Sequence, residues 1–115
     1  MISEQKLAQE YISIINNYYP ETGKLLRHCH VQVIKSSLAR KDKNYYYVGI
    51  YYPENLAQKL LVKKPIFQEI AENMGLIEVV FLNANRLIRD PLSKIKQQHP
   101  RFWLELAWIA SQPHP

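Results

Sequence analysis

The sequence predicts an α+β fold in which a three-stranded sheet packs against helices, with additional helices at the C-terminal end. Apolar residues recur at helical spacing near the N-terminus and again after residue 54. Two other stretches, residues 45–52 and 76–82, have the aromatic and β-branched composition of strands. The chain has 115 residues, the size of one ordinary domain, so we expect a single domain over residues 1–115.

Two helices are expected at the N-terminal end. Ser3 is a good N-cap residue, and the apolar positions that follow it recur at helical spacing until Pro20. The first helix should therefore span about residues 3–18, because proline lacks the amide donor that would continue it. A short second helix over residues 21–28 would place two leucines on the core.

A β-hairpin should follow these helices. Residues 30–35 have strand character, and residues 45–52 are the strongest strand signal because tyrosine, valine and isoleucine suit a pleated surface. The polar and strongly basic residues 36–44 should connect the two strands. Pro53 should end the second one.

Helical spacing returns over residues 54–74, where Pro65 must kink or split the helix. Gly75 is well placed as the C-terminal cap. Residues 76–82 should form the third strand of the sheet. They are apolar on both faces except at Glu78, so this strand should be central or well covered.

Two further helices, over residues 85–98 and 100–112, are predicted as a C-terminal extension. Prolines at positions 91 and 100 should break this region. The expected core residues, which recur on one face of their elements, are Leu56, Leu60, Ile66, Phe67, Ile70, Val79 and Phe81.

The cysteine content and the polar N-terminal residues indicate the cellular compartment. Cys29 is alone, so no intramolecular disulfide forms, and the polar start of the chain does not resemble a signal peptide. We therefore expect a cytoplasmic protein. The apolar run over residues 102–110 is about half as long as a membrane-spanning helix, so we expect no membrane association.

The net charge of +5 is unevenly distributed. Residues 24–64 contain nine basic residues against two acidic ones, so the middle of the chain is a basic module. Such a field favours nucleic acid, an acidic protein surface or anionic lipid, and the charge does not choose among them. A surface that serves only solubility is the alternative.

The sequence offers no catalytic or metal-binding constellation. His28, Cys29 and His30 are adjacent, but successive strand side chains point to opposite faces, and no second ligand pair accompanies them. Three glycines are too few for a phosphate-binding loop or a dinucleotide fingerprint, and the acidic residues are scattered. We therefore expect that the protein is not an enzyme and has no cofactor and no metal.

A basic loop beside a tyrosine-rich strand is the first candidate binding site. Tyr45, Tyr47 and Tyr51 share one strand face with Gly49, next to the basic connection over residues 36–44. Single-stranded nucleic acid uses this combination, because bases stack on rings while cations contact phosphates. A tyrosine strand covered by helices is the alternative. The candidate nucleic-acid-binding residues here are Arg40, Lys41, Lys43, Tyr45 and Tyr47.

A second basic group completes the candidate nucleic-acid site. Lys59, Lys63 and Lys64 are spaced so that they share one sector of a helix surface. They are candidates for phosphate contact, and a solvated helix face is the alternative.

The last predicted helix is apolar nearly all round. Phe102, Leu106 and Ile109 fall on one stripe, and Leu104 falls with Trp108 on another. Such a helix is either deeply packed or holds a partner, since exposed tryptophans would form a larger apolar patch than monomers usually carry. The candidate partner-binding residues are Phe102, Trp103 and Trp108.

Five short stretches resemble the N-terminal domain of DciA-type proteins, the bacterial operators of the replicative helicase. They are Ile15–Pro20, Leu26–Val31, Tyr47–Tyr51, Asn55–Leu60 and Ile77–Phe81. The order helix, short helix, strand, strand, helix, strand is also that of a type-II-like KH fold, and the N-terminal domain of the initiator DnaA has a similar topology. The resemblance implies a KH-like core over residues 12–83, followed by the helical extension over residues 85–112. It further implies recruitment or loading of a hexameric helicase, with affinity for DNA.

Two functions of different classes are open at this point. The first is a non-catalytic binding module, a DNA- or helicase-associated accessory protein. The second is a protein–protein adaptor or assembly factor without nucleic-acid affinity. Salt dependence separates them, because binding through phosphates weakens steeply as salt rises whereas an apolar docking surface does not.

Overall fold

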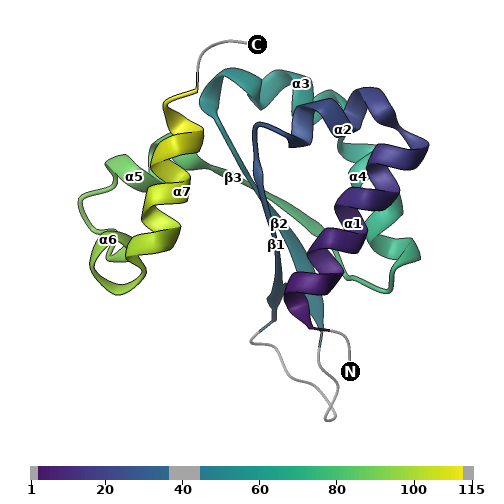
Figure 1. Cartoon of the computed structure of the whole chain (residues 1–115), viewed down its shortest axis with the longest axis horizontal. Coiled ribbons are helices and arrows are strands. Elements are labelled where there is room, and N and C mark those ends of the chain that lie inside the picture. The colour runs from purple at the N-terminus through teal and green to yellow at the C-terminus, as the bar shows by residue number, and fades with distance from the viewer. Residues whose placement is uncertain (1–2, 37–44, 113–115) are drawn as a thin grey trace.

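The computed structural model describes residues 3–36 and 45–112. In this part of the chain, helices pack against a three-stranded sheet, so the predicted α+β fold is confirmed (Figure 1). The elements in chain order are α1 (Glu4–Tyr18), α2 (Pro20–Leu26), β1 (His30–Lys35), β2 (Tyr46–Tyr52), the 3-10 helix η1 (Glu54–Leu56), α3 (Ala57–Val62), α4 (Lys64–Asn73), β3 (Val79–Asn83), α5 (Ala84–Arg89), α6 (Ile95–Gln98) and α7 (Pro100–Ala110).

The two N-terminal helices begin at the residues that the sequence predicts as a cap and a break, Ser3 and Pro20. The Ser3 hydroxyl caps α1 by accepting the amide of Lys6 at 3.1 Å. Pro20 stands at the start of α2, where a missing amide costs little. The second helix ends at Leu26 and is shorter than expected, because the chain already turns towards β1 there.

The predicted hairpin is confirmed, with β1 antiparallel to β2 so that His30 lies opposite Tyr51 and Ile34 opposite Tyr47. The third strand, β3, pairs with the other side of β2 in parallel. In the described residues the sheet order is therefore β1-β2-β3, and β2 is the central strand.

The third strand differs from the prediction in position and extent. It spans Val79–Asn83 rather than residues 76–82. It lies at an edge of the sheet and only Val79 in it is buried, so the prediction of a central or well-covered strand was wrong. The end of α4 explains the shift. Gly75 takes φ +80° as the predicted cap, and the amide of Leu76 bonds back to the carbonyl of Ala71 at 2.9 Å. The first of the predicted strand residues thus completes the helix cap.

The helical region after β2 is split where the sequence predicted a break. It forms η1 and α3, passes through Lys63, and continues as α4 with Pro65 in its first turn. A proline is accepted there because the first amides of a helix have no partner within the helix.

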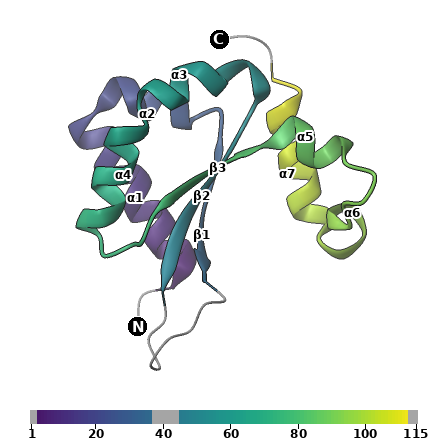
Figure 2. The ribbon, with the colours of Figure 1, turned by 180° about the vertical axis from the view of Figure 1, so that it is seen from behind.

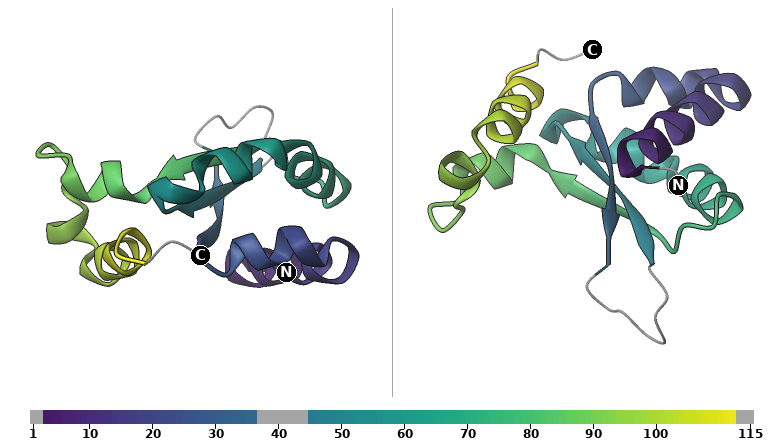
Figure 3. Two further views of the ribbon diagram at one scale, coloured as in Figure 1. Left: turned by 90° about the horizontal axis from the view of Figure 1, so that it is seen from above. Right: turned by 60° about the horizontal axis from the view of Figure 1, so that its bottom comes forward.

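Helices lie on both sides of the sheet (Figures 2 and 3). Each side has its own hydrophobic cluster. Helices α1 to α4 cover one face over the larger cluster, where Tyr11, Ile50 and Phe67 are fully buried. Helices α5 to α7 lie on the other side, where Leu106 and Ile109 pack with Tyr51 in the smaller cluster. Strand β2 consequently contributes side chains to both.

Most of the predicted core residues are buried. Leu56, Leu60, Phe67, Ile70 and Val79 are at most 6% exposed. Ile66 and Phe81 are only partly buried, so those two predictions were wrong. Phe81 packs at the border of the larger cluster, in the edge strand β3, where neighbours are lacking on one side. Ile66 lies in the first turn of α4 and is not among the residues packed against that cluster.

The C-terminal region forms three helices in the described residues, where two were expected. Pro91 ends α5 as predicted, and the carboxylate of Asp90 accepts the amide of Leu92 at 2.9 Å in the turn that follows. The chain then forms the short helix α6 before α7. No helix within residues 3–36 and 45–112 has both the length and the hydrophobicity needed to cross a membrane.

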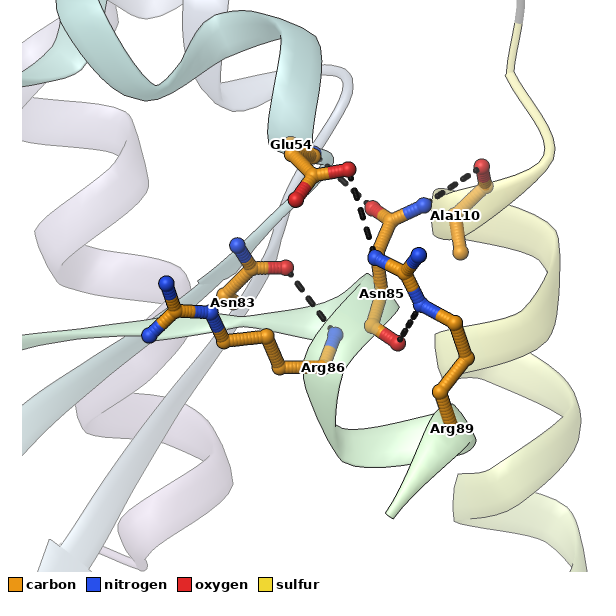
Figure 4. A network of polar contacts seen from close by, with 6 residues as sticks. All are labelled: Glu54, Asn83, Asn85, Arg86, Arg89 and Ala110. Atoms are coloured by element: carbon orange, nitrogen blue, oxygen red, sulfur yellow. Dashed lines mark hydrogen bonds and ion pairs between the residues drawn. The ribbon is translucent and has the colours of Figure 1, made fainter.

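A polar network attaches this C-terminal layer to the end of the sheet (Figure 4). The Asn85 side chain accepts the amide of Glu54 at 2.9 Å and donates to the carbonyl of Ala110 at 3.3 Å. Arg89 donates to the carbonyl of Asn85 and pairs with the carboxylate of Glu54 at 3.3 Å. A single asparagine therefore joins η1, α5 and α7.

Replacing Phe67 by alanine should lower the free energy of unfolding by about 3–5 kcal/mol, since its ring is fully buried and packs edge-on to Phe81. Chemical denaturation monitored by circular dichroism measures this loss. Leu61→Ala, on the exposed side of α3, is the control and should change stability by less than about 0.5 kcal/mol. A loss below about 1 kcal/mol for Phe67→Ala would contradict the described core.

Candidate functional site

The second face of the sheet is covered at one end and open at the other. At the covered end Tyr51 is only 8% exposed beneath α7, and its ring meets that of Phe102 edge-on at 4.9 Å. At the open end Ile34 and Tyr47 are partly exposed. Tyr51 is therefore not available for stacking, whereas Tyr47 is.

A groove of about 620 Å³ lies between the open half of this face and the beginning of α7. Gln32, Ile34 and Tyr47 line it on the sheet side, and His99 and Arg101 line it on the α7 side. Arg101 makes no ion pair with the described residues, so its charge is available to an anion. The groove thus combines an aromatic ring, two polar side chains and a cation.

His30 and Glu105 close the inner end of the groove. The Nδ1 atom of His30 is 3.0 Å from the Glu105 carboxylate, and its ring packs against both Tyr51 and Phe102, with ring centres 5.7 and 5.5 Å away. Burial lowers the pKa of His30, and the charge of Glu105 opposes this effect only in part. At neutral pH the neutral imidazole therefore donates its Nδ1 proton to Glu105, which links β1 to α7.

The predicted basic loop lies partly outside the described residues. Arg40, Lys41 and Lys43 are in that part, so their role stays a prediction. Their flanks are described: the amide of Ser36 donates to the carbonyl of Tyr45 at 2.7 Å. In the sequence, the basic segment therefore joins the end of β1 to the beginning of β2, next to the partly exposed Tyr47.

The second predicted basic group lies elsewhere. Lys59 is in α3, Lys63 follows that helix and Lys64 begins α4, all in the helical layer on the opposite face of the sheet from Tyr47. They also follow the far end of β2, about 20 Å along the strand from its beginning. Among the described residues, the structure therefore places this second basic group on the other face of the sheet from Tyr47.

The three predicted partner-binding residues have different environments. Phe102 packs against Tyr51 within the smaller cluster, and Trp103 is half-buried with the ammonium of Lys96 4.9 Å from its ring centre. Trp108 is 61% exposed, and Leu104, on the same stripe, is 62% exposed. The two predicted stripes of α7 are thus one buried and one exposed, and Trp108 is the candidate that faces solvent.

The chemistry around Cys29 is that of a packed thiol. Its sulfur lies 3.5 Å from the carbonyl of Leu25, and burial raises its pKa to about 12. The thiol is therefore protonated at neutral pH. Among the described residues, no three histidine, cysteine, aspartate or glutamate side chains converge as a metal site would require.

The sequence does not indicate the α7 side of the groove. His99 and Arg101 belong to the predicted C-terminal extension, and nothing local in the sequence shows that α7 packs over the sheet. The sheet side of the groove is indicated more weakly in β1, where Gln32 is a polar residue in an otherwise apolar strand, on the same face as Tyr47. Assigning the residues of both hairpin strands to the two faces of the sheet places Gln32 beside Tyr47.

Folding stability should fall as the pH drops below about 6.5 through the titration of His30. Burial depresses the pKa of this histidine in the folded state, so the unfolded chain binds its proton at higher pH and acid favours unfolding. Thermal unfolding at pH 7 and pH 5 measures the effect in the wild type and in His30→Gln. The variant should lose less stability on acidification, and an equal loss in both proteins would contradict the description of His30.

No family model, curated protein or solved structure matches this chain. The resemblance to DciA-type domains accordingly stays a prediction.

Proposed function

We propose that this protein is a non-catalytic module that binds single-stranded DNA in the groove between β1, β2 and α7. The observation that carries the proposal is the partly exposed ring of Tyr47, which shares the groove with Arg101. Stacking on an aromatic ring and phosphate contact by a cation are the two interactions that sequence-tolerant single-strand binding requires.

The residues of the groove contact different parts of the DNA strand in this proposal. A base stacks on Tyr47, and Gln32 and His99 offer hydrogen bonds to base edges. Arg101 contacts the phosphate backbone, and Arg40, Lys41 and Lys43, which lie in the sequence between β1 and β2, are proposed as further phosphate contacts. A single strand fits this arrangement better than a duplex, because a stacked base pair does not present a free ring face to Tyr47.

Tyr47→Leu should weaken binding to a labelled single-stranded oligonucleotide by about 1–3 kcal/mol, because leucine keeps an apolar side chain on the strand but offers no ring for stacking. Fluorescence anisotropy at low salt measures the affinity. Tyr18→Leu is the matched control, since Tyr18 is 73% exposed at the end of α1 and away from the groove. Equal affinity of Tyr47→Leu and the wild type would refute stacking at this position.

Two matched triple variants separate the two basic groups. Changing Arg40, Lys41 and Lys43 to glutamine should reduce the salt slope of single-strand binding by about two units, at about 0.7 per lost phosphate contact. The same changes at Lys59, Lys63 and Lys64 remove equal charge and should leave the slope nearly unchanged. The reverse result would move the site to the helical layer. No binding by the wild type at about 50 mM salt would end the DNA proposal altogether.

The adaptor alternative is favoured by one observation, the exposure of Leu104 and Trp108 on α7. Two large apolar side chains on neighbouring turns are more typical of a contact surface than of a solvated helix. The resemblance to DciA-type domains adds a hexameric replicative helicase as the proposed partner. A helicase complex that persists at high salt and is lost with Trp108→Ala would support this role.

A further inference from the structure

The outer edge of β1 presents backbone groups without partners. The Ser36 amide donates a hydrogen bond to the carbonyl of Tyr45. In an antiparallel pair every second residue forms such bonds with the partner strand. Ile34, Gln32 and His30 therefore also point their amides and carbonyls towards β2. The residues between them, Val31, Val33 and Lys35, turn theirs outward. No described residue forms a hydrogen bond with these outward groups.

This edge lacks the usual protection of an edge strand. Its pairing register with β2 is continuous, it contains no proline, and the only cation on it is Lys35 at its end. The opposite edge of the sheet, formed by β3, has a hydrogen-bond partner for one of its outward amides. There the side chain of Gln68 accepts the outward amide of Val79 at 3.1 Å, and the strand passes directly into α5.

Grooves lie on both sides of the open edge. One of about 350 Å³ separates β1 from α1 and is lined by Gln5 and Ala8, and the groove of about 620 Å³ separates β1 from α7. Figure 1 shows β1 between α7 and α1, and the view from above in Figure 3 agrees. An added strand would therefore alternate its side chains between these two walls.

The exposed tryptophan, Trp108, lies on α7, close in sequence to two side chains that contact residues in and just before β1. Glu105 contacts His30, and the side chain of Gln112 is 2.7 Å from that of His28. Trp108 follows Glu105 by about one turn of α7, and its side chain is 61% exposed.

We propose that the outer edge of β1 binds an extended peptide segment of a partner protein, which adds to the sheet as a fourth strand. Alternating donors and acceptors at strand spacing are complementary to another strand and to no other common ligand. One side of the peptide packs on Ala8, and an apolar residue on its other side covers Trp108. The peptide site uses the edge of the sheet and the proposed DNA site uses its face, and the two sites share the groove of about 620 Å³.

The test uses the full chain and a displayed library of random peptides of about ten residues, long enough to form one strand. A selected peptide should slow hydrogen exchange at the amides of Val31, Val33 and Lys35. Lys35→Pro removes an outward donor without touching the bonds to β2, and it should weaken binding about tenfold or more. Lys35→Ala, which loses the same charge but keeps the amide, should bind as the wild type does.

Trp108→Ala is a second test variant, needed in case Lys35→Pro disturbs folding. Trp108→Ala should also weaken peptide binding, and Tyr18→Ala, another exposed aromatic residue, should not. The proposal is overturned if the library yields no binder, or if binders leave the three amides unprotected. It is equally overturned if light scattering shows a dimer that Lys35→Pro dissociates, since a second copy of the chain would then occupy the edge.

Discussion

Strand β2 has to satisfy two hydrophobic clusters at once, and the rest of the structure depends on this constraint. Its even-numbered side chains Val48 and Ile50 are fully buried against α1 and α4, while Tyr51 on the other face is buried under α7. The second cluster is smaller than the sheet face on which it lies. That mismatch leaves the half of the face around Tyr47 open, and the groove results from it.

The alternation along β2 also explains why a tyrosine-rich strand is stable here. Tyr46 and Tyr52 are partly buried and pack against the larger cluster. The hydroxyl of the fully buried Tyr11 donates a hydrogen bond to the carbonyl of Phe67 at 2.9 Å. Among the described residues, no tyrosine hydroxyl is both fully buried and without a hydrogen-bond partner.

Local patterns predicted the elements well and their assembly less well. Caps and prolines located α1, the split at Pro65 and the turn at Gly75, because these depend on backbone geometry within a few residues. The start of β3 was misplaced because the cap after α4 uses a residue with strand composition. Its edge position was missed because apolar residues on both faces of a strand do not show which neighbours cover them.

The candidate site was predictable in part for the same reason. The face shared by Tyr45 and Tyr47 followed from strand periodicity, and the exposed stripe with Trp108 followed from helical periodicity. The contribution of Arg101 depended on where α7 packs, which is a contact between distant segments. The separation of Tyr47 from Lys59 likewise required the sheet, because charge counted along the sequence does not record which face of a sheet a residue occupies.

We propose the open half of the sheet face as the binding surface. Nuclear magnetic resonance titration of the labelled protein with a single-stranded oligonucleotide tests this proposal most directly. The largest chemical-shift changes should occur at Gln32, Tyr47 and Arg101. Changes confined to α3 and the beginning of α4, or no changes at low salt, would contradict it.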